Sequence, residues 1–113
     1  MTNPLRNLRA LGQSVWLDYL ARRILDDGAL QRLIDEDGLA GMTSNPSIFE
    51  KAIGETGDYD DRIAAALTAG VTQPMDLYER LAVDDIQDAA HIFRPTWDRL
   101  AGADGYVSLE VSP

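Results

Sequence analysis

Residues 39–51 constrain the fold of this chain more than any other stretch, because a short apolar run is followed directly by an abrupt helix start. The run Leu-Ala-Gly-Met-Thr at 39–43 predicts a buried strand. Asn45 then offers a helix-capping side chain, and Pro46 stands at the first helical position, where its missing N–H costs nothing. A buried strand that turns straight into a helix is typical of α/β proteins, whose reactive groups gather at such turns.

Two further segments have the character of short strands. Residues 15–17 are Val-Trp-Leu and are followed by Asp18, and residues 106–111 come after a glycine-containing turn. The segment 19–37 keeps apolar residues at helical spacing, with an interruption at 27–28, and Gly38 suits a helix C-terminus. It therefore predicts a crossover of one or two helices.

The segment between the second and third predicted strands is expected to be wholly helical. A helix after Asn45 gives way to a polar loop at 54–58, and another helix is expected from about 59 to 69. Three more helices are then expected, opened by Pro74, by the acidic pair at 84–85 and by Pro95. Near the N-terminus, leucines at 5, 8 and 11 predict a short amphipathic helix that covers the rest of the chain.

Long helical connections imply that the predicted strands are parallel, since antiparallel neighbours are joined by tight turns. The predicted class is therefore α/β. A three-stranded parallel sheet leaves both edges open, whereas a closed (β/α)8 barrel needs about 250 residues. We expect residues 1–113 to form a single partial domain: the first three β/α units of a TIM (β/α)8 barrel behind an N-terminal cover helix. The open strand edges also offer a route to self-association.

Composition excludes several classes of function. A net charge of −9 argues against nucleic acid as a partner, because such binding relies on Lys and Arg at the phosphates. No apolar run approaches the roughly 20 residues that span a bilayer, and the N-terminus lacks the apolar core of a signal peptide. There is no cysteine and a single histidine, His91, so no metal site and no cofactor are expected. The expected location is the cytoplasm.

Asp18, Asn45 and Glu110 each fall near the carboxyl end of a predicted strand, where the side chains of a parallel sheet meet in a common mouth. Alternation along the third strand places Glu110 on the same face as Ser108 and Tyr106, away from the helices. The residues alone also allow a simpler interpretation, in which the two carboxylates are solvated strand ends and Asn45 is only a helix cap.

Four blocks of the sequence together resemble transaldolase, in the longer form found in actinobacteria and their relatives. In chain order they are SVWLDY at 14–19, LIDEDGL at 33–39, TSNPSIFEKAI at 43–53 and GYVSLEVSP at 105–113. The resemblance covers most of the chain and implies a TIM barrel. It also implies an enzyme of the pentose phosphate pathway, in which a lysine forms a Schiff base with a ketose phosphate and a dihydroxyacetone unit passes to an aldose phosphate.

The resemblance implies a role for each candidate residue. Asp18 corresponds to the acid/base for carbon–carbon cleavage, and Glu110 corresponds to the carboxylate that handles the water of imine formation and hydrolysis. Asn45 corresponds to the amide that orients the substrate, with Thr43 and Ser44 beside it in the substrate site. The implied partners are sugar phosphates bound in the complete barrel.

The resemblance also indicates what the chain lacks. The family's Schiff-base lysine and its phosphate-binding basic residues lie on later strands, so the chain alone is expected to be inactive. Its only lysine, Lys51, lies on a predicted helix, without the burial or the nearby cation that a nucleophilic lysine needs. Arg22 and Arg23 are expected on the solvent side of the first crossover. Two alternatives stay open: a non-catalytic binding or assembly module that docks on another chain, and a compact aldolase that uses Lys51.

Overall fold

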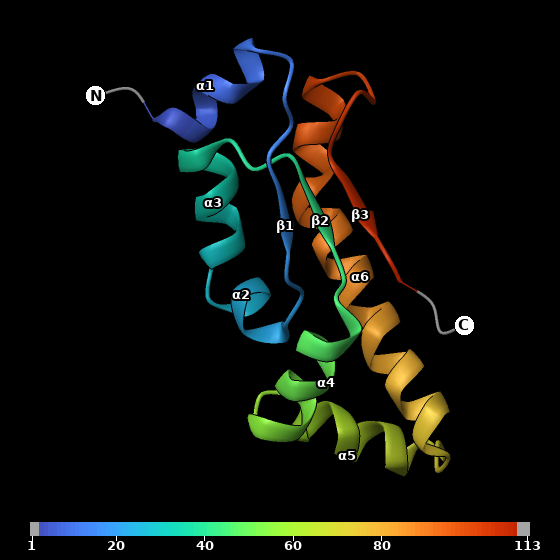
Figure 1. Cartoon of the computed structure of the whole chain (residues 1–113). Helices are drawn as coiled ribbons and strands as arrows, with labels where there is room; N and C mark the ends of the chain where they lie inside the picture. The colour runs from blue at the N-terminus through green and yellow to red at the C-terminus, as the bar shows by residue number, and fades with distance from the viewer. Residues whose placement is uncertain (1–2, 111–113) are drawn as a thin grey trace.

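The computed structural model describes residues 3–110 and contains a sheet of three short strands in the order β1-β2-β3. The strands are β1 (Trp16–Asp18), β2 (Gly41–Thr43) and β3 (Tyr106–Ser108). Both pairings are parallel, and Leu17, Met42 and Val107 lie in register across the sheet (Figure 1). The prediction of a parallel α/β arrangement is confirmed.

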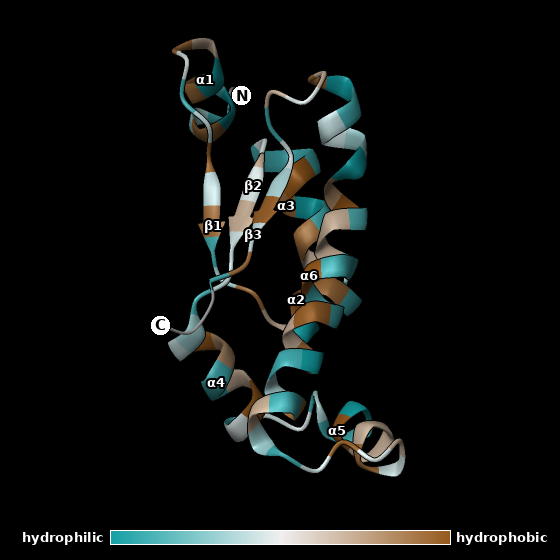
Figure 2. Ribbon diagram, turned by 90° about the vertical axis from the view of Figure 1, so that its right-hand side faces the viewer, coloured by the Kyte–Doolittle hydropathy of each residue, from teal (hydrophilic) through white to brown (hydrophobic). Residues whose placement is uncertain are grey.

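Helices connect the strands and cover one face of the sheet. They are α1 (Pro4–Ala10), α2 (Arg22–Asp26), α3 (Ala29–Asp37), α4 (Pro46–Glu55), α5 (Asp60–Thr68) and α6 (Pro74–Arg99). Figure 2 shows α2, α3 and α6 on the same side of the sheet. Helices α4 and α5 and the first half of α6 lie beyond the carboxyl ends of the strands, and α1 lies near the opposite end (Figure 1).

Two hydrophobic clusters hold these layers together. The sheet cluster lies between the strands and α2, α3 and α6, and its buried members are Leu20, Leu25, Leu30, Ile34, Leu39, Met42, Ala89 and Phe93. The end cluster joins α4, the residue before α5, and α6, and its buried members are Phe49, Tyr59, Leu81 and Ala82. Burial of each large apolar side chain among them contributes about 1.5–3 kcal/mol, so the two clusters stabilise the packing of the helices on the sheet and on one another.

The opposite face of the sheet is exposed within the described part of the chain. Trp16 and Tyr106 stand on it and are 38% and 47% exposed. Trp16 lies directly over Gly41, where an added Cβ would stand only 2.1 Å from the indole Cε2 atom. The indole Nε1 donates a hydrogen bond of 3.0 Å to the buried Asp104 carboxylate. The absence of a side chain at position 41 is therefore what allows a tryptophan to lie flat on this face.

Helix α6 corrects the prediction of three helices after residue 73. It is one helix of 26 residues with Pro95 inside it, and Asp85 lies in its middle with no exposed surface. Leu81, Ala89 and Phe93 recur along its buried face and belong to the two clusters. Packing of one continuous apolar face outweighs the loss of a single backbone hydrogen bond at a proline, so the helix continues through positions that resemble helix starts.

Other boundaries differ by a few residues. Strands β2 and β3 are shorter than the predicted segments 39–43 and 106–111, because each is paired over three residues only. Residue 111 lies outside the described residues. The predicted polar loop at 54–58 starts later, since α4 continues to Glu55. The crossover, predicted as one or two helices, consists of two, and Gly38 at its C-terminus is confirmed as a left-handed residue with φ of 71°.

The position of Arg22 is a second correction, because this side chain is buried rather than solvated. Arg22 is 3% exposed, and its Nη2 atom lies 2.5 Å from Oδ1 of the fully buried Asp85. The Tyr59 hydroxyl donates to Oδ2 of the same carboxylate at 2.5 Å and accepts from the backbone N–H of Arg22 at 2.7 Å. Arg23, by contrast, is exposed and pairs with Asp58 at 3.0 Å. Sequence spacing alone cannot distinguish these neighbours, since the distinction depends on α6.

The charges in this buried network stabilise one another. Burial opposes the charged form of Arg22, but hydrogen bonds to Asp88 and the charge of Asp85 outweigh it and raise the arginine pKa. Burial raises the pKa of Asp85, and the donors Tyr59 and Arg22 oppose that rise. The network ties α2 to α6 and to the residue that precedes α5.

Within residues 3–110, no helix is both long enough and apolar enough to cross a bilayer.

Candidate active site

Three of the predicted site residues meet at the carboxyl ends of β1 and β2. Asp18 and Thr43 are the last residues of these strands and are paired in register. The Thr43 hydroxyl donates to Asp18 Oδ1 at 2.6 Å, and the Asn45 side-chain N–H donates to Asp18 Oδ2 at 3.1 Å. Both carboxylate oxygens of Asp18 therefore have a donor, which fixes the orientation of an exposed carboxylate.

Asn45 performs a structural task at the same time. Its Oδ1 atom accepts hydrogen bonds from the backbone N–H groups of Ser47 at 3.1 Å and Ile48 at 3.3 Å, which caps α4. Its Nδ2 atom faces Asp18. The amide thus bonds backbone with one end and the candidate carboxylate with the other, so the cap holds the Asn45 N–H in place beside Asp18.

Ser44 connects this edge to the chain after β3. Its backbone N–H donates to the Ser108 carbonyl at 2.9 Å, and its hydroxyl accepts from the backbone N–H of Glu110 at 2.8 Å. Ser44 is 5% exposed. Its contacts therefore hold the backbone of Glu110 next to the end of β2, whereas its predicted place in the substrate site stays a prediction.

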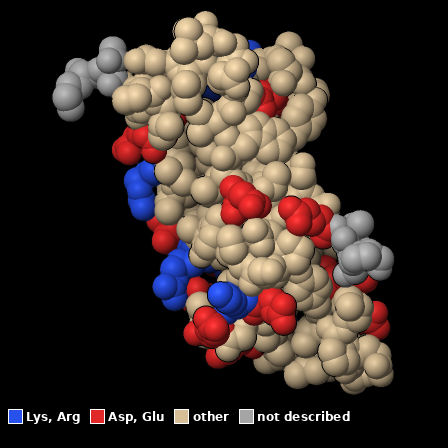
Figure 3. Space-filling model, in the orientation of Figure 1, with Lys and Arg blue, Asp and Glu red and all other residues tan. Residues whose placement is uncertain are grey.

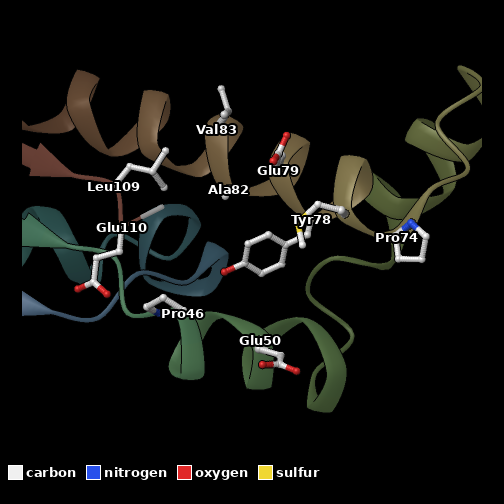
Figure 4. Close-up of a pocket in the computed structure, with 10 residues that line it drawn as sticks. Pro46, Glu50, Pro74, Tyr78, Glu79, Ala82, Val83, Leu109 and Glu110 are labelled. Atoms are coloured by element: carbon white, nitrogen blue, oxygen red, sulfur yellow. The ribbon is translucent and has the colours of Figure 1, made fainter. Parts of the chain in front are cut away.

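Glu110 lies beside this group rather than within it. Strand β3 ends at Ser108, so strand alternation does not extend to Glu110. The side chain lines a groove of about 550 Å³ between α4 and α6, next to Pro46 (Figure 4). Among the described residues, no hydrogen bond joins the Glu110 carboxylate to Asp18 or Asn45. The structure thus brings Asp18, Thr43 and Asn45 into contact and places Glu110 at the adjoining groove.

The electrostatic environment keeps Asp18 ionised. The hydrogen bond from Thr43, followed by that from Asn45, lowers the pKa of Asp18 below its usual value, because both favour the charged form. Figure 3 shows acidic side chains where the strands end, while most basic side chains of this face lie to one side, over α2, α3 and α4. At neutral pH the Asp18 side chain is therefore an ionised carboxylate.

Thr43→Val is expected to raise the pKa of Asp18 toward its ordinary value, because the Thr43 hydroxyl makes the largest contribution to the lowered value. Since the folded-state pKa lies below the unfolded one, the Asp18 carboxylate favours the folded state at neutral pH. This contribution fades as the pH falls below about 4. Carbon-detected NMR titration of the Asp18 carboxyl group measures the change.

The matched control is Thr68→Val, since the Thr68 hydroxyl donates to its own helix, at the Ala64 carbonyl, 3.0 Å away. This control is expected to leave the Asp18 midpoint in place. Equal titration midpoints of Asp18 in Thr43→Val and in the unsubstituted chain would contradict the assignment of Thr43 as the donor that lowers the Asp18 pKa.

Lys51 lies outside the group formed by Asp18, Thr43 and Asn45. It is exposed on α4 and lines a second pocket of about 270 Å³ together with Tyr19, Arg23 and Asp58. The nearby Arg23 cation is already paired with Asp58.

Within residues 3–110, no group of three or more histidine or acidic side chains is arranged to hold a metal ion.

Comparison with known proteins identifies the family. Residues 15–113 match the family model described as transaldolase/fructose-6-phosphate aldolase. The chain is 47% identical over 111 residues to a transaldolase of Thiobacillus denitrificans, covering 98% of the chain and 31% of that relative. It is 44% identical over 113 residues to a transaldolase of Trichodesmium erythraeum, covering 100% of the chain and 30% of the relative.

A third relative, transaldolase 2 of Streptomyces coelicolor, is 42% identical over 113 residues, again 100% of the chain and 30% of the relative. The chain thus spans about 30% of the length of the relatives that it matches. The sequence blocks that suggested the resemblance all lie within or next to the matched residues. Because the match covers most of its length, this chain belongs to the transaldolase/fructose-6-phosphate aldolase family.

Proposed function

We propose that this chain supplies the first three β/α units of a transaldolase barrel and, with them, half of its active site. The complete enzyme transfers a dihydroxyacetone unit, through a Schiff base, from a ketose phosphate to an aldose phosphate. The observation that carries the proposal is the contact of Asp18 with both Thr43 and Asn45 at the carboxyl edge of parallel strands. Reactive groups of barrel enzymes occupy this edge.

Each residue has a defined role in this proposal. Asp18, ionised and held by two donors, accepts the proton of the sugar hydroxyl as the carbon–carbon bond breaks and later returns it. Asn45, fixed by its cap, orients the substrate, with Thr43 and Ser44 beside it. Glu110 handles the water that enters and leaves during imine formation and hydrolysis.

The Schiff-base lysine is taken to come from strands outside residues 1–113. Lys51 is exposed on α4 and makes a poor nucleophile, because a protonated, solvated amine does not attack a carbonyl. We therefore expect the chain alone to be inactive. The exposed face that carries Trp16 and Tyr106, together with the unpaired edges of β1 and β3, supports docking on further strands.

The same exposed face favours a second candidate function. A non-catalytic module that binds or assembles with another chain would use these aromatic side chains and strand edges without any chemistry at Asp18. The two functions differ in one respect, since only the first requires that Asp18, Asn45 and Glu110 act on a sugar phosphate.

A chimeric enzyme distinguishes the catalytic function from the assembly function. This chain replaces the segment that it matches in the Thiobacillus denitrificans transaldolase, at 47% identity. The chimera is expected to transfer the dihydroxyacetone unit and to be labelled covalently by fructose 6-phosphate under borohydride reduction. The chain alone is expected to stay unlabelled, with Lys51→Ala as its control. A folded chimera without activity would overturn the catalytic proposal and favour the assembly module.

A further inference from the structure

The pairing of β2 with β3 changes at Ser44 from backbone to side chain. Thr43 lies opposite Ser108, so Ser44 would lie opposite the next residue if the pairing continued. At that register a regular parallel ladder uses both backbone groups of Ser44. Its N–H bonds the Ser108 carbonyl, and its carbonyl accepts from the Glu110 N–H. The first of these bonds is present, at 2.9 Å.

The second bond is made by the side chain of Ser44 instead of its carbonyl. The Glu110 N–H donates to the Ser44 hydroxyl oxygen at 2.8 Å. A serine hydroxyl has two acceptor lone pairs, and such side chains compete with the backbone for local hydrogen bonds. This replacement accounts for the end of β3 at Ser108, and with it for the loss of strand alternation before Glu110.

The contact lies at the edge of the sheet that carries the candidate site. Ser44 is 5% exposed and stands between Thr43 and Asn45 in the chain. Both of these neighbours donate to the Asp18 carboxylate. The bond to Ser44 therefore brings the backbone of Glu110 beside them. Glu110 is exposed, and among the described residues its carboxylate makes no hydrogen bond or ion pair, so its side chain can turn about a backbone that is held.

We propose that Ser44 is a positioning residue for Glu110, because its hydroxyl sets the place where the chain leaves β3 and from which the Glu110 carboxylate acts. The resemblance implies a place for Ser44 in the substrate site, whereas this proposal assigns its hydroxyl to the protein backbone. Catalytic groups act only from a narrow range of positions, and a misplacement of about 1 Å can cost about 10²-fold in rate. The inference rests on the proposed role of Glu110 in catalysis.

The contact is tested on this chain alone by amide hydrogen exchange, followed by NMR. Ser44→Ala removes the acceptor, so the Glu110 amide is expected to exchange about tenfold faster. The amide at position 44, which bonds the Ser108 carbonyl, is expected to keep its exchange rate and so to show that the strands remain paired.

Ser47→Ala is the matched control for the exchange experiment. Ser47 is exposed on α4, and among the described residues its hydroxyl makes no hydrogen bond. This variant is expected to leave the exchange of the Glu110 amide unchanged. Equal exchange of that amide in Ser44→Ala and Ser47→Ala would overturn the proposal.

The consequence for catalysis is tested in the chimeric enzyme. Ser44→Ala is expected to lower kcat about tenfold with KM nearly unchanged, because it displaces a catalytic group without removing a substrate contact. A serine that binds the substrate directly would instead give a raised KM. Either that result or an unchanged kcat would refute the positioning role.

A double variant shows whether Ser44 acts through Glu110. The carboxylate is already absent in Glu110→Gln, so the addition of Ser44→Ala is expected to lower kcat by less than about twofold further. A further tenfold loss would mean that Ser44 acts by another route, which contradicts the proposal.

The two proposals fail in different ways. An inactive chimera, with a Glu110 amide that still depends on Ser44, would refute the catalytic function and leave the contact intact. An active chimera that Ser44→Ala does not impair would refute the role of Ser44 and leave the proposed function standing.

Discussion

Asp85→Ala is expected to reduce the free energy of unfolding by about 3–5 kcal/mol, because it removes the fully buried partner of the Arg22 guanidinium and leaves only the more exposed carboxylates of Asp88 and Asp26. Arg22 and Asp85 are 3% and 0% exposed, and their closest atoms lie 2.5 Å apart. The Tyr59 hydroxyl would lose its acceptor in the same step. Since small domains have only about 5–15 kcal/mol of stability in total, the variant is expected to unfold at much lower urea concentration or to lose its cooperative transition.

Asp26→Ala is the matched control, because Asp26 contacts the same guanidinium at 3.3 Å but has a 63% exposed side chain. Exposed ion pairs contribute about 0–1 kcal/mol, so this variant is expected to remain close to the unsubstituted chain. Urea denaturation followed by far-UV circular dichroism compares the two. Similar midpoints for Asp85→Ala and Asp26→Ala would show that the buried ion pair does not stabilise the fold.

Asp18→Asn in the chimeric enzyme is expected to lower kcat by about 10²–10⁴, the usual range for loss of a general acid–base group. The substitution keeps the size of the side chain and can still contact Thr43 and Asn45, so folding and KM are expected to change little. A steady-state transaldolase assay with a ketose phosphate donor and an aldose phosphate acceptor measures the effect.

Asp35→Asn serves as the control for Asp18→Asn, since Asp35 is exposed on α3 and its carboxylate accepts a hydrogen bond from Gln31 of the same helix. It is expected to keep kcat within about twofold of the parent chimera, as surface changes usually have little effect. A loss below tenfold in a folded Asp18→Asn chimera would remove Asp18 from the acid–base role.

Local sequence signals predicted the parts of this fold that depend on neighbours along the chain. The cap at Asn45 followed by Pro46, and the left-handed Gly38, are confirmed because each is determined by a few adjacent residues. Asp18 and Asn45 were placed at one sheet edge from the parallel arrangement alone, and the structure brings their side chains within 3.1 Å.

Features that depend on distant partners could not be predicted in the same way. Pro95 resembles a helix start, but α6 continues through it because its buried face packs on both clusters. Arg22 is buried only because Asp85, 63 residues later, lies opposite it. Glu110 was placed by strand alternation, which ends at Ser108, and its side chain lines the groove between α4 and α6 instead.

The continuity of α6 also determines how this chain can loosen. At about 1.5 Å per residue its 26 residues extend roughly 39 Å, most of the 49 Å length of the molecule. One helix, α6, therefore packs against both apolar clusters. Neither cluster can unfold without releasing helix backbone that also supports the other. Residues 74–99 thus couple the two clusters, and unfolding of either one is expected to destabilise the other.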